Sequence, residues 1–172
     1  MKRYLICLFT ISCLSACGES SESTNSNTSA ADMSVESGDD MSMAALPEGC
    51  DSLVSPSEND GETVQTALIE AVEGSTVCLG EGTFHFRTEV SLAVANVTIR
   101  GAGMDQTILD FSDQDVGGNG VLISADGATV EDLRVLNTPG EGIRANEVNG
   151  ITFRRVSVIW ERDADSNNGA YG

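Results

Sequence analysis

Basic residues are scarce in this sequence. Its 172 residues include nine lysines and arginines against 27 aspartates and glutamates, which gives a formal net charge of −18 at pH 7. After Lys2 and Arg3, the next basic residue is Arg87. A strongly acidic surface repels the phosphates of nucleic acids and of anionic lipid headgroups. We therefore expect no nucleic-acid partner.

The N-terminus has no apolar run long enough to cross a bilayer. A charged start is followed by an apolar stretch from Tyr4 to Leu14, well short of the roughly 20 residues that a membrane span requires. A short apolar stretch behind a charged start is typical of a secretion signal.

The segment Leu14-Ser-Ala-Cys17 resembles the lipobox of bacterial lipoproteins. The resemblance implies that residues 1–16 are a signal peptide and that Cys17 carries the lipid. An ordinary signal peptide that contains a cysteine is the alternative. Gly18 stands where Asp would indicate inner-membrane retention in this class. We expect a protein anchored by its lipid in the bacterial cell envelope, at the outer membrane, on its periplasmic or surface face.

The two cysteines that remain after processing form a candidate disulfide. Of five cysteines, Cys7 and Cys13 leave with the signal and Cys17 is acylated, so Cys50 and Cys78 are left. An even pair in an exported chain predicts a disulfide, with two buried thiols as the alternative. Such a bond is expected to stabilise the fold by roughly 3 to 4 kcal/mol.

Residues 17–49 have the composition of a tether. Residues 18–49 are rich in Ser, Asn, Thr, Asp and Glu, with no aromatic and no basic residue. Such a segment buries too little apolar surface to fold. We expect a disordered acidic tether of about thirty residues that reaches on the order of 30 Å.

A short pattern repeats in the second half of the chain. The segment Ala128-Thr-Val-Glu-Asp-Leu-Arg-Val135 returns as Ile151-Thr-Phe-Arg-Arg-Val-Ser-Val158, each behind an Asp-Gly or Asn-Gly pair. A third copy, Val97-Thr-Ile99, precedes the first by a somewhat longer interval. Repeats at intervals of roughly 20 to 30 residues are typical of the coils of a parallel β-helix.

Stacking the coils predicts which side chains share a column. The expected interior columns are Val97 with Ala128 and Ile151, Ile99 with Val130 and Phe153, Leu133 with Val156, and Val135 with Val158. Thr98, Thr129 and Thr152 then point outward in one column, which resembles the threonine ladders of ice-binding β-solenoids. The strand preference of threonine explains that column equally well.

One amphipathic helix is expected before these coils. Apolar residues recur at helical spacing from Thr63, and Gly74 is placed as a stop. The apolar positions are Val64, Ala67, Leu68, Ala71 and Val72. Such a helix covers the open apolar end of a stack of coils. Residues 50–172 hold about four coils, and we expect them to be the N-terminal coils of a longer domain.

Two runs carry a family resemblance. Val77-Cys-Leu-Gly-Glu-Gly-Thr-Phe84 and Val97 through Phe111 resemble the opening of right-handed parallel β-helix proteins with the pectin lyase fold. Gly140–Ile143, Val156–Trp160 and Asn168–Gly172 are similar to bacterial exported parallel β-helix repeat proteins of unassigned activity. The resemblance spans residues 60–172. It implies an all-β, right-handed parallel β-helix with an N-terminal capping helix, and it implies no particular activity.

No catalytic residue is assigned. Enzymes of this superfamily that cut or epimerise acidic polysaccharides need a base and a cation that neutralises the sugar carboxylate. The only histidine, His85, is expected to point outward without a partner. Val158–Asp163 resembles the Trp-Ile-Asp-His segment of pectate lyases, but Glu161 and Arg162 replace the Asp and the His. Pro139 stands where polygalacturonases have a catalytic carboxylate.

Two weaker site hypotheses lie near the C-terminal end of the sequence. Asp163, Asp165 and Asn167 place oxygen ligands at alternate positions, as at the start of a calcium loop, with a solvated turn as the alternative. Three arginines beside Trp160 are a candidate platform for acidic sugars, with pairing to Glu161 and Asp163 as the alternative. These arginines are Arg154, Arg155 and Arg162. Calcium is the one cofactor that the sequence suggests.

The sequence as a whole leads to two functional hypotheses. The first is a lipid-anchored envelope β-helix that serves as a binding or scaffold module for glycans or other surface polymers. The alternative is a polysaccharide lyase or epimerase that acts on an acidic polysaccharide, with its active site in coils beyond residue 172.

Replacing Cys17 by Ser tests the predicted anchor. Because the acyl chains supply the membrane affinity, Cys17→Ser should block processing or release the protein into the soluble fraction. Cell fractionation with metabolic labelling by a fatty acid reports both effects. A wild-type protein that is soluble and takes up no label contradicts the lipobox interpretation.

Overall fold

The computed structural model describes residues 46–162, which contain one helix and ten strands. Contacts divide the chain into two units, residues 1–41 and 42–172, and the elements below belong to the second. In chain order they are β1 (Ser52–Val54), α1 (Asp60–Glu70), β2 (Thr76–Leu79), β3 (Gly82–His85), β4 (Thr88–Leu92), β5 (Thr98–Arg100), β6 (Thr107–Asp110), β7 (Val116–Ile123), β8 (Thr129–Leu136), β9 (Ile143–Ala145) and β10 (Thr152–Ile159). This part of the chain is mostly β.

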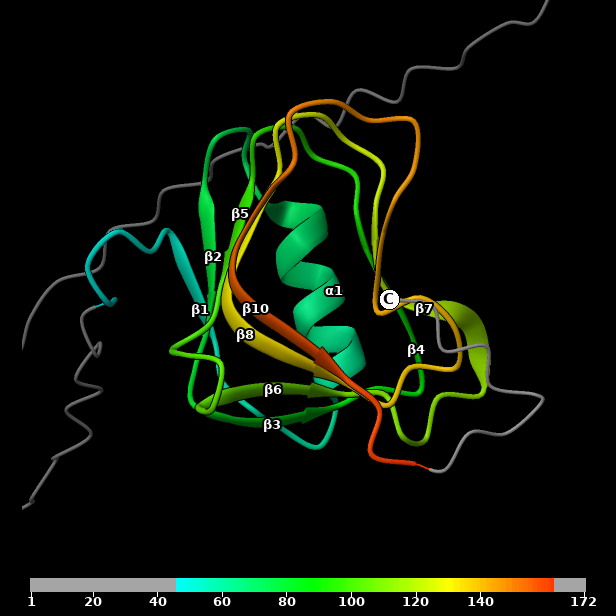
Figure 1. The fold of residues 1–172 in the computed structure, drawn as a ribbon. Coiled ribbons are helices and arrows are strands. Elements are labelled where there is room, and N and C mark those ends of the chain that lie inside the picture. Colours follow the sequence, from blue (N-terminus) through cyan, green and yellow to red (C-terminus); the bar gives the residue numbers. More distant parts are fainter. Residues whose placement is uncertain (1–45, 163–172) are drawn as a thin grey trace, which may run out of the picture. The chain divides into compact units, whose positions relative to one another are not determined.

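All the paired strands run parallel and stack in layers. One series of pairs runs β1-β2-β5-β8-β10, a second runs β3-β6-β8, and a third runs β4-β7-β9. The long strand β8 belongs to two series, because its first half pairs with β5 and its second half with β6. The parallel strands of residues 46–162 therefore form a curled sheet that wraps around the apolar core (Figure 1).

The change of direction within β8 and β10 occurs at one residue in each strand. Asp132 has φ 59° and Arg155 has φ 50°, which is left-handed backbone. Gly101, after β5, lies directly below the first of these bends. A Cβ added to Gly101 would lie 2.2 Å from the Asp132 carbonyl oxygen, so the layers pack closely there only because this residue is glycine.

The register matches the interior columns predicted from the repeat. Ile99 pairs with Val130, and Val130 pairs with Phe153. The pairs Leu133 with Val156 and Val135 with Val158 also form. Ile99, Val130, Leu133 and Val135 are buried in a single apolar cluster. Phe86 and Phe111 stack within the same cluster, with ring centroids 4.7 Å apart.

Helix α1 covers the first layer, as predicted, but its limits differ. It begins at Asp60 rather than Thr63 and buries Val64 and Leu68 in the core. Val72 was expected on the buried face and is 73% exposed, because the helix ends at Glu70 and the next residue, Ala71, is extended.

Two polar side chains fasten α1 to the strands. Asp60 is buried, and its carboxylate accepts hydrogen bonds from the backbone N–H of Ser57 at 2.6 Å and of His85 at 2.7 Å. The Gln65 amide donates to the Ser91 carbonyl at 2.9 Å and accepts from the Ser91 N–H at 2.8 Å. The Gln65 side chain therefore replaces a neighbouring strand at the free edge of β4.

The described residues also contain two very short strands and a disulfide. The three-residue strands β1 and β9 were not predicted. A disulfide joins Cys50 and Cys78 with their Cα atoms 5.7 Å apart, and it ties the segment before β1 to β2. Between residues 46 and 162, no helix is both long enough and apolar enough to span a membrane.

Matched aspartate substitutions in neighbouring positions test the register. Val130 is fully buried, whereas Thr129 is only half-buried on the outer face. Val130→Asp places an unpaired charge in the core and should lower the free energy of unfolding by about 3 to 5 kcal/mol. Thr129→Asp should lower it by less than about 1 kcal/mol. Urea unfolding measures both, and equal losses contradict the register.

Candidate functional site: an arginine row on the outer face

Charged side chains line the outer face of β5, β8 and β10. Because side chains alternate along a strand, the residues after the buried Ile99 and Val130 point outward. The register places Arg100 opposite Glu131 and Glu131 opposite Arg154. One carboxylate therefore lies between two guanidiniums in three consecutive layers.

Glu131 is held by both arginines. Its Oε1 lies 2.7 Å from Arg100 Nε, and its Oε2 lies 2.6 Å from Arg154 Nη2. The second contact is an ion pair without hydrogen-bond geometry, so Oε2 has no hydrogen-bond donor among residues 46–162. The Glu131 side chain is 3% exposed, against 33% for Arg100 and 56% for Arg154. The buried charge is thus compensated by guanidiniums that partly face solvent.

A second pair forms where the strands bend. Arg155 Nε lies 2.5 Å from Asp132 Oδ1, and Arg155 Nη2 lies 2.7 Å from Asp132 Oδ2. This two-point contact suits the planar guanidinium and fixes its orientation. The hydrogen bonds lower the pKa of Asp132 below its ordinary value and raise that of Arg155 above its own.

The outer face carries a local excess of positive charge. Arg100, Arg154 and Arg155, which we call the arginine row, face the carboxylates of Glu131 and Asp132. Three positive charges and two negative charges leave a local charge of +1, in a chain whose total is −18. Glu48 and Glu81 line a cavity with Arg100, so the excess of positive charge lies at the Arg154 and Arg155 end of the row, where an anion is repelled least.

The guanidiniums also hold unused hydrogen-bond donors. Each guanidinium has five N–H groups. Hydrogen bonds within residues 46–162 use Arg100 Nε and Nη1, the latter to the Gly49 carbonyl at 3.3 Å, and use Arg155 Nε and Nη2. Arg154 Nη2 lies against Glu131 Oε2, and the other donors have no hydrogen-bond partner among residues 46–162, so they can bind oxygen atoms of a ligand.

A column of hydroxyl groups runs beside the arginine row. Thr76, Thr98, Thr129 and Thr152 lie in register in four consecutive layers, two residues before the charged column. Three of these were predicted from the repeat, and Thr76 extends the column into β2. The outer face thus offers hydroxyls and guanidiniums side by side.

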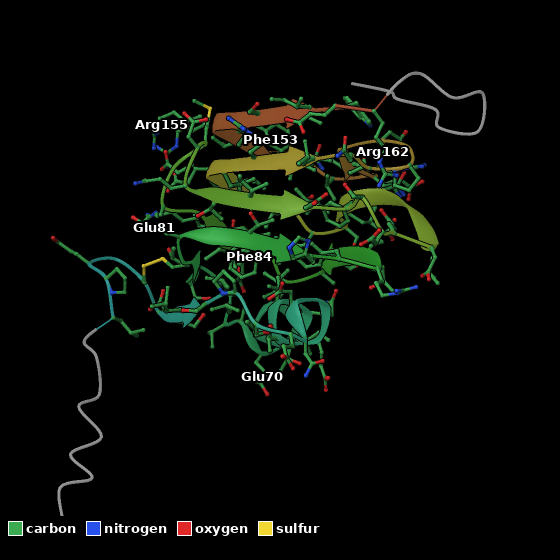
Figure 2. All side chains as sticks on the ribbon, turned by 90° about the horizontal axis from the view of Figure 1, so that it is seen from below. Glu70, Glu81, Phe84, Phe153, Arg155 and Arg162 are labelled. Carbon is green, nitrogen blue, oxygen red and sulfur yellow. A yellow bond between two sulfur atoms is a disulfide. The ribbon has the colours of Figure 1, made fainter. Side chains whose placement is uncertain are left out.

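The predicted platform of Arg154, Arg155 and Arg162 beside Trp160 does not assemble. Figure 2 shows Arg155 and Arg162 on opposite sides of the last layer. Arg162 donates to the Ser112 carbonyl, and Trp160 Nε1 donates to the Thr138 carbonyl at 2.8 Å. Strand β10 rises by about 3.3 Å per residue. It therefore separates Arg154 and Arg155, near its start, from Trp160 and Arg162, beyond its end.

The pairing of these arginines also differs from the expected one. Arg154 and Arg155 contact Glu131 and Asp132 of the neighbouring strand rather than Glu161. Arg100 was missed, although the intervals of the repeat lead from Arg100 to Glu131 and on to Arg154.

His85 points outward as predicted, and a carboxylate lies beside it. Its side chain is 67% exposed, and Nδ1 lies 3.7 Å from Asp110 Oδ2, in the next layer. The Asp110 Oδ1 atom accepts a hydrogen bond from the Ser112 N–H. This separation is too long for a hydrogen bond, so the two side chains lie beside each other without one.

The other predicted site residues are outside the structural description. Cys17 and the calcium-loop residues Asp163, Asp165 and Asn167 lie beyond residues 46–162. Within that range, no group of three or more His, Cys, Asp or Glu side chains is placed to hold a metal ion.

No protein-family model matches the chain, and no curated protein matches it.

The acid dependence of stability tests the bend pair. Because the folded pKa of Asp132 is lowered, its charge stabilises the fold above its unfolded pKa, and this contribution disappears as the pH falls through the folded pKa. Asp132→Asn should therefore lose less stability than wild type between neutral pH and roughly pH 2. Urea midpoints across that range measure it, with the exposed Glu58→Gln as control. Parallel curves for Asp132→Asn and wild type contradict the assignment.

Proposed function

We propose that this chain is a lipid-anchored parallel β-helix protein of the bacterial envelope that binds an acidic polysaccharide through the arginine row. The observation that carries the proposal is the local charge of +1 with unused N–H donors on an otherwise acidic protein. Guanidiniums recognise carboxylate and sulfate groups by paired hydrogen bonds, which suits a polymer that bears such groups.

The proposed fold is the right-handed parallel β-helix with a pectin lyase type of coil. Its support is the stacking of β5, β8 and β10 as parallel neighbours, one interval of the sequence repeat apart. Connections between parallel strands of one sheet are right-handed in about 98% of cases. The sequence resemblance of residues 60–172 to this fold points the same way.

The proposed location follows from the N-terminal sequence. The lipobox-like segment that ends at Cys17 supplies the anchor, and residues 17–49 supply a tether of on the order of 30 Å. Residues 46–86 contain acidic residues and no lysine or arginine, so this end of the domain is repelled by anionic headgroups.

A lyase or epimerase for acidic polysaccharide is the second candidate. The feature that favours it is the His85–Asp110 contact. Catalytic hydrogen bonds are often long in the absence of substrate, and a closer approach of the Asp110 carboxylate to Nδ1 would orient the ring for proton transfer at Nε2. This candidate does not require the arginine row to bind anything.

Binding measurements with paired substitutions test the proposed function. Wild-type protein should bind immobilised hyaluronan or polygalacturonate, but not neutral dextran, with an affinity that falls as salt increases. The double substitution Arg154→Gln and Arg155→Gln removes two charge-assisted contacts and should weaken binding at least about tenfold.

The matched control is Arg144→Gln, an exposed arginine on β9 outside the row, which should change the affinity less than about twofold. Equal binding to dextran, or equal effects of the two changes, contradicts the proposal. Growth of ultraviolet absorbance from unsaturated sugar ends, lost in His85→Gln, favours the enzyme instead.

A further inference from the structure

The turn that leads into β10 contains an Asn-Gly pair, Asn149 and Gly150, and both residues are exposed. Gly150 has φ 73°, a left-handed conformation that favours glycine, and Gly127 has φ 72° at the equivalent place before β8. The pair therefore lies at the surface of the last described layer, just before the strand that carries Arg154 and Arg155.

An Asn-Gly pair can react within the chain when its groups are free to meet. The backbone nitrogen of the glycine attacks Cγ of the asparagine, the C–N bond of the side-chain amide breaks, and ammonia leaves with the proton of the glycine nitrogen. Water then opens the resulting succinimide ring at either carbonyl, which gives aspartate or isoaspartate. Glycine has no Cβ to hinder the attacking nitrogen.

We infer that Asn149 is a site of spontaneous conversion to aspartate and isoaspartate, with water as the second reactant. The attack requires the peptide group between Asn149 and Gly150 to rotate. The N–H of this group has no hydrogen-bond acceptor among residues 46–162, and its carbonyl accepts one bond, from the Gly127 N–H at 2.9 Å. The turn therefore restrains the reacting groups only weakly.

A second Asn-Gly pair, inside β7, is held much more firmly. Gly120 is buried, and its N–H donates to the Glu141 carbonyl at 2.9 Å. The carbonyl of Asn119 accepts a hydrogen bond from the Gln114 side chain at 2.9 Å, and its side-chain amide donates to the Glu89 carboxylate. Three hydrogen bonds must break before this pair can react, so the structure protects it.

Isoaspartate at position 149 alters the junction between the last two described layers. It lengthens the backbone by a methylene before β10, and it turns the carbonyl that accepts the Gly127 N–H into a carboxylate outside the main chain. Both products also place a negative charge beside Asp126, whose carboxylate accepts the Asn149 N–H at 2.7 Å, and like charges repel. The first bond of the next strand, from the Thr152 N–H to the Ala128 carbonyl at 2.9 Å, should therefore loosen.

Peptide mass spectrometry after incubation of the folded protein at mildly alkaline pH tests the inference. Trypsin releases Asn149 in the peptide Ala145–Arg154 and Asn119 in the peptide Gly101–Arg134. Fragment ions separate Asn149 from Asn146, which no glycine follows. Asn149 should convert at least about tenfold faster than Asn119, because Asn119 is held by the additional hydrogen bonds.

The same incubation in urea is the control, because the fold no longer distinguishes the two pairs. Both asparagines should then convert at similar rates. Similar rates in the folded protein, or faster conversion of Asn119, overturn the inference. An Asn149 that converts in urea and stays intact in the folded protein also overturns it.

Hydrogen exchange of the incubated protein tests the structural consequence. The Thr152 N–H should exchange at least about tenfold faster in the isoaspartate form than in the unmodified protein, whereas the Val130 N–H should keep its protection. Asn149→Gln, whose longer side chain disfavours ring closure, should stay unmodified and keep the Thr152 N–H protected after the same incubation. Equal exchange of Thr152 in the modified and unmodified forms contradicts the predicted loosening.

Discussion

The parallel, in-register pairing of successive layers is the constraint on which both the core and the outer face depend. Side chains alternate along each strand, so the pairing that buries Ile99 and Val130 also brings Arg100 beside Glu131. A slip of one residue would turn Val130 outward and Glu131 into the apolar interior. The burial of the core therefore fixes the position of the arginine row, although the charges themselves contribute little to stability at exposed positions.

The first and last layers of the described stack differ in how they are covered. At the first layer, α1 buries Val64 and Leu68, and Gln65 satisfies the free edge of β4. At the last layer, β10 pairs with β8 alone among the described strands, and Phe153 in its interior column is 50% exposed. Arg154 and Arg155 of this layer are the most exposed members of the row, so the row is most accessible there.

The sequence predicted most of the structural features that follow the repeat and few of those that do not. The interior columns follow from the intervals of the repeat, and the same intervals would have led to Arg100. The start of α1 at Asp60 was missed, because the groups that stabilise its buried carboxylate include the His85 N–H, 25 residues away. The arginine platform was wrong, because Arg155 turns to Asp132 of the neighbouring strand whereas Arg162, beyond the far end of β10, turns to the Ser112 carbonyl. Short strands such as β9 lack enough alternation to be recognised.

The most direct test of this account is the set of contacts made by the Val130 methyl groups. Nuclear Overhauser spectra of methyl-labelled protein should show Val130 close to Ile99 on one side and to the Phe153 ring on the other, because these three residues share one column. If the Val130 methyls lack either contact, the register is wrong. Arg100, Glu131 and Arg154 would then not share a column, and the proposed binding site would not exist.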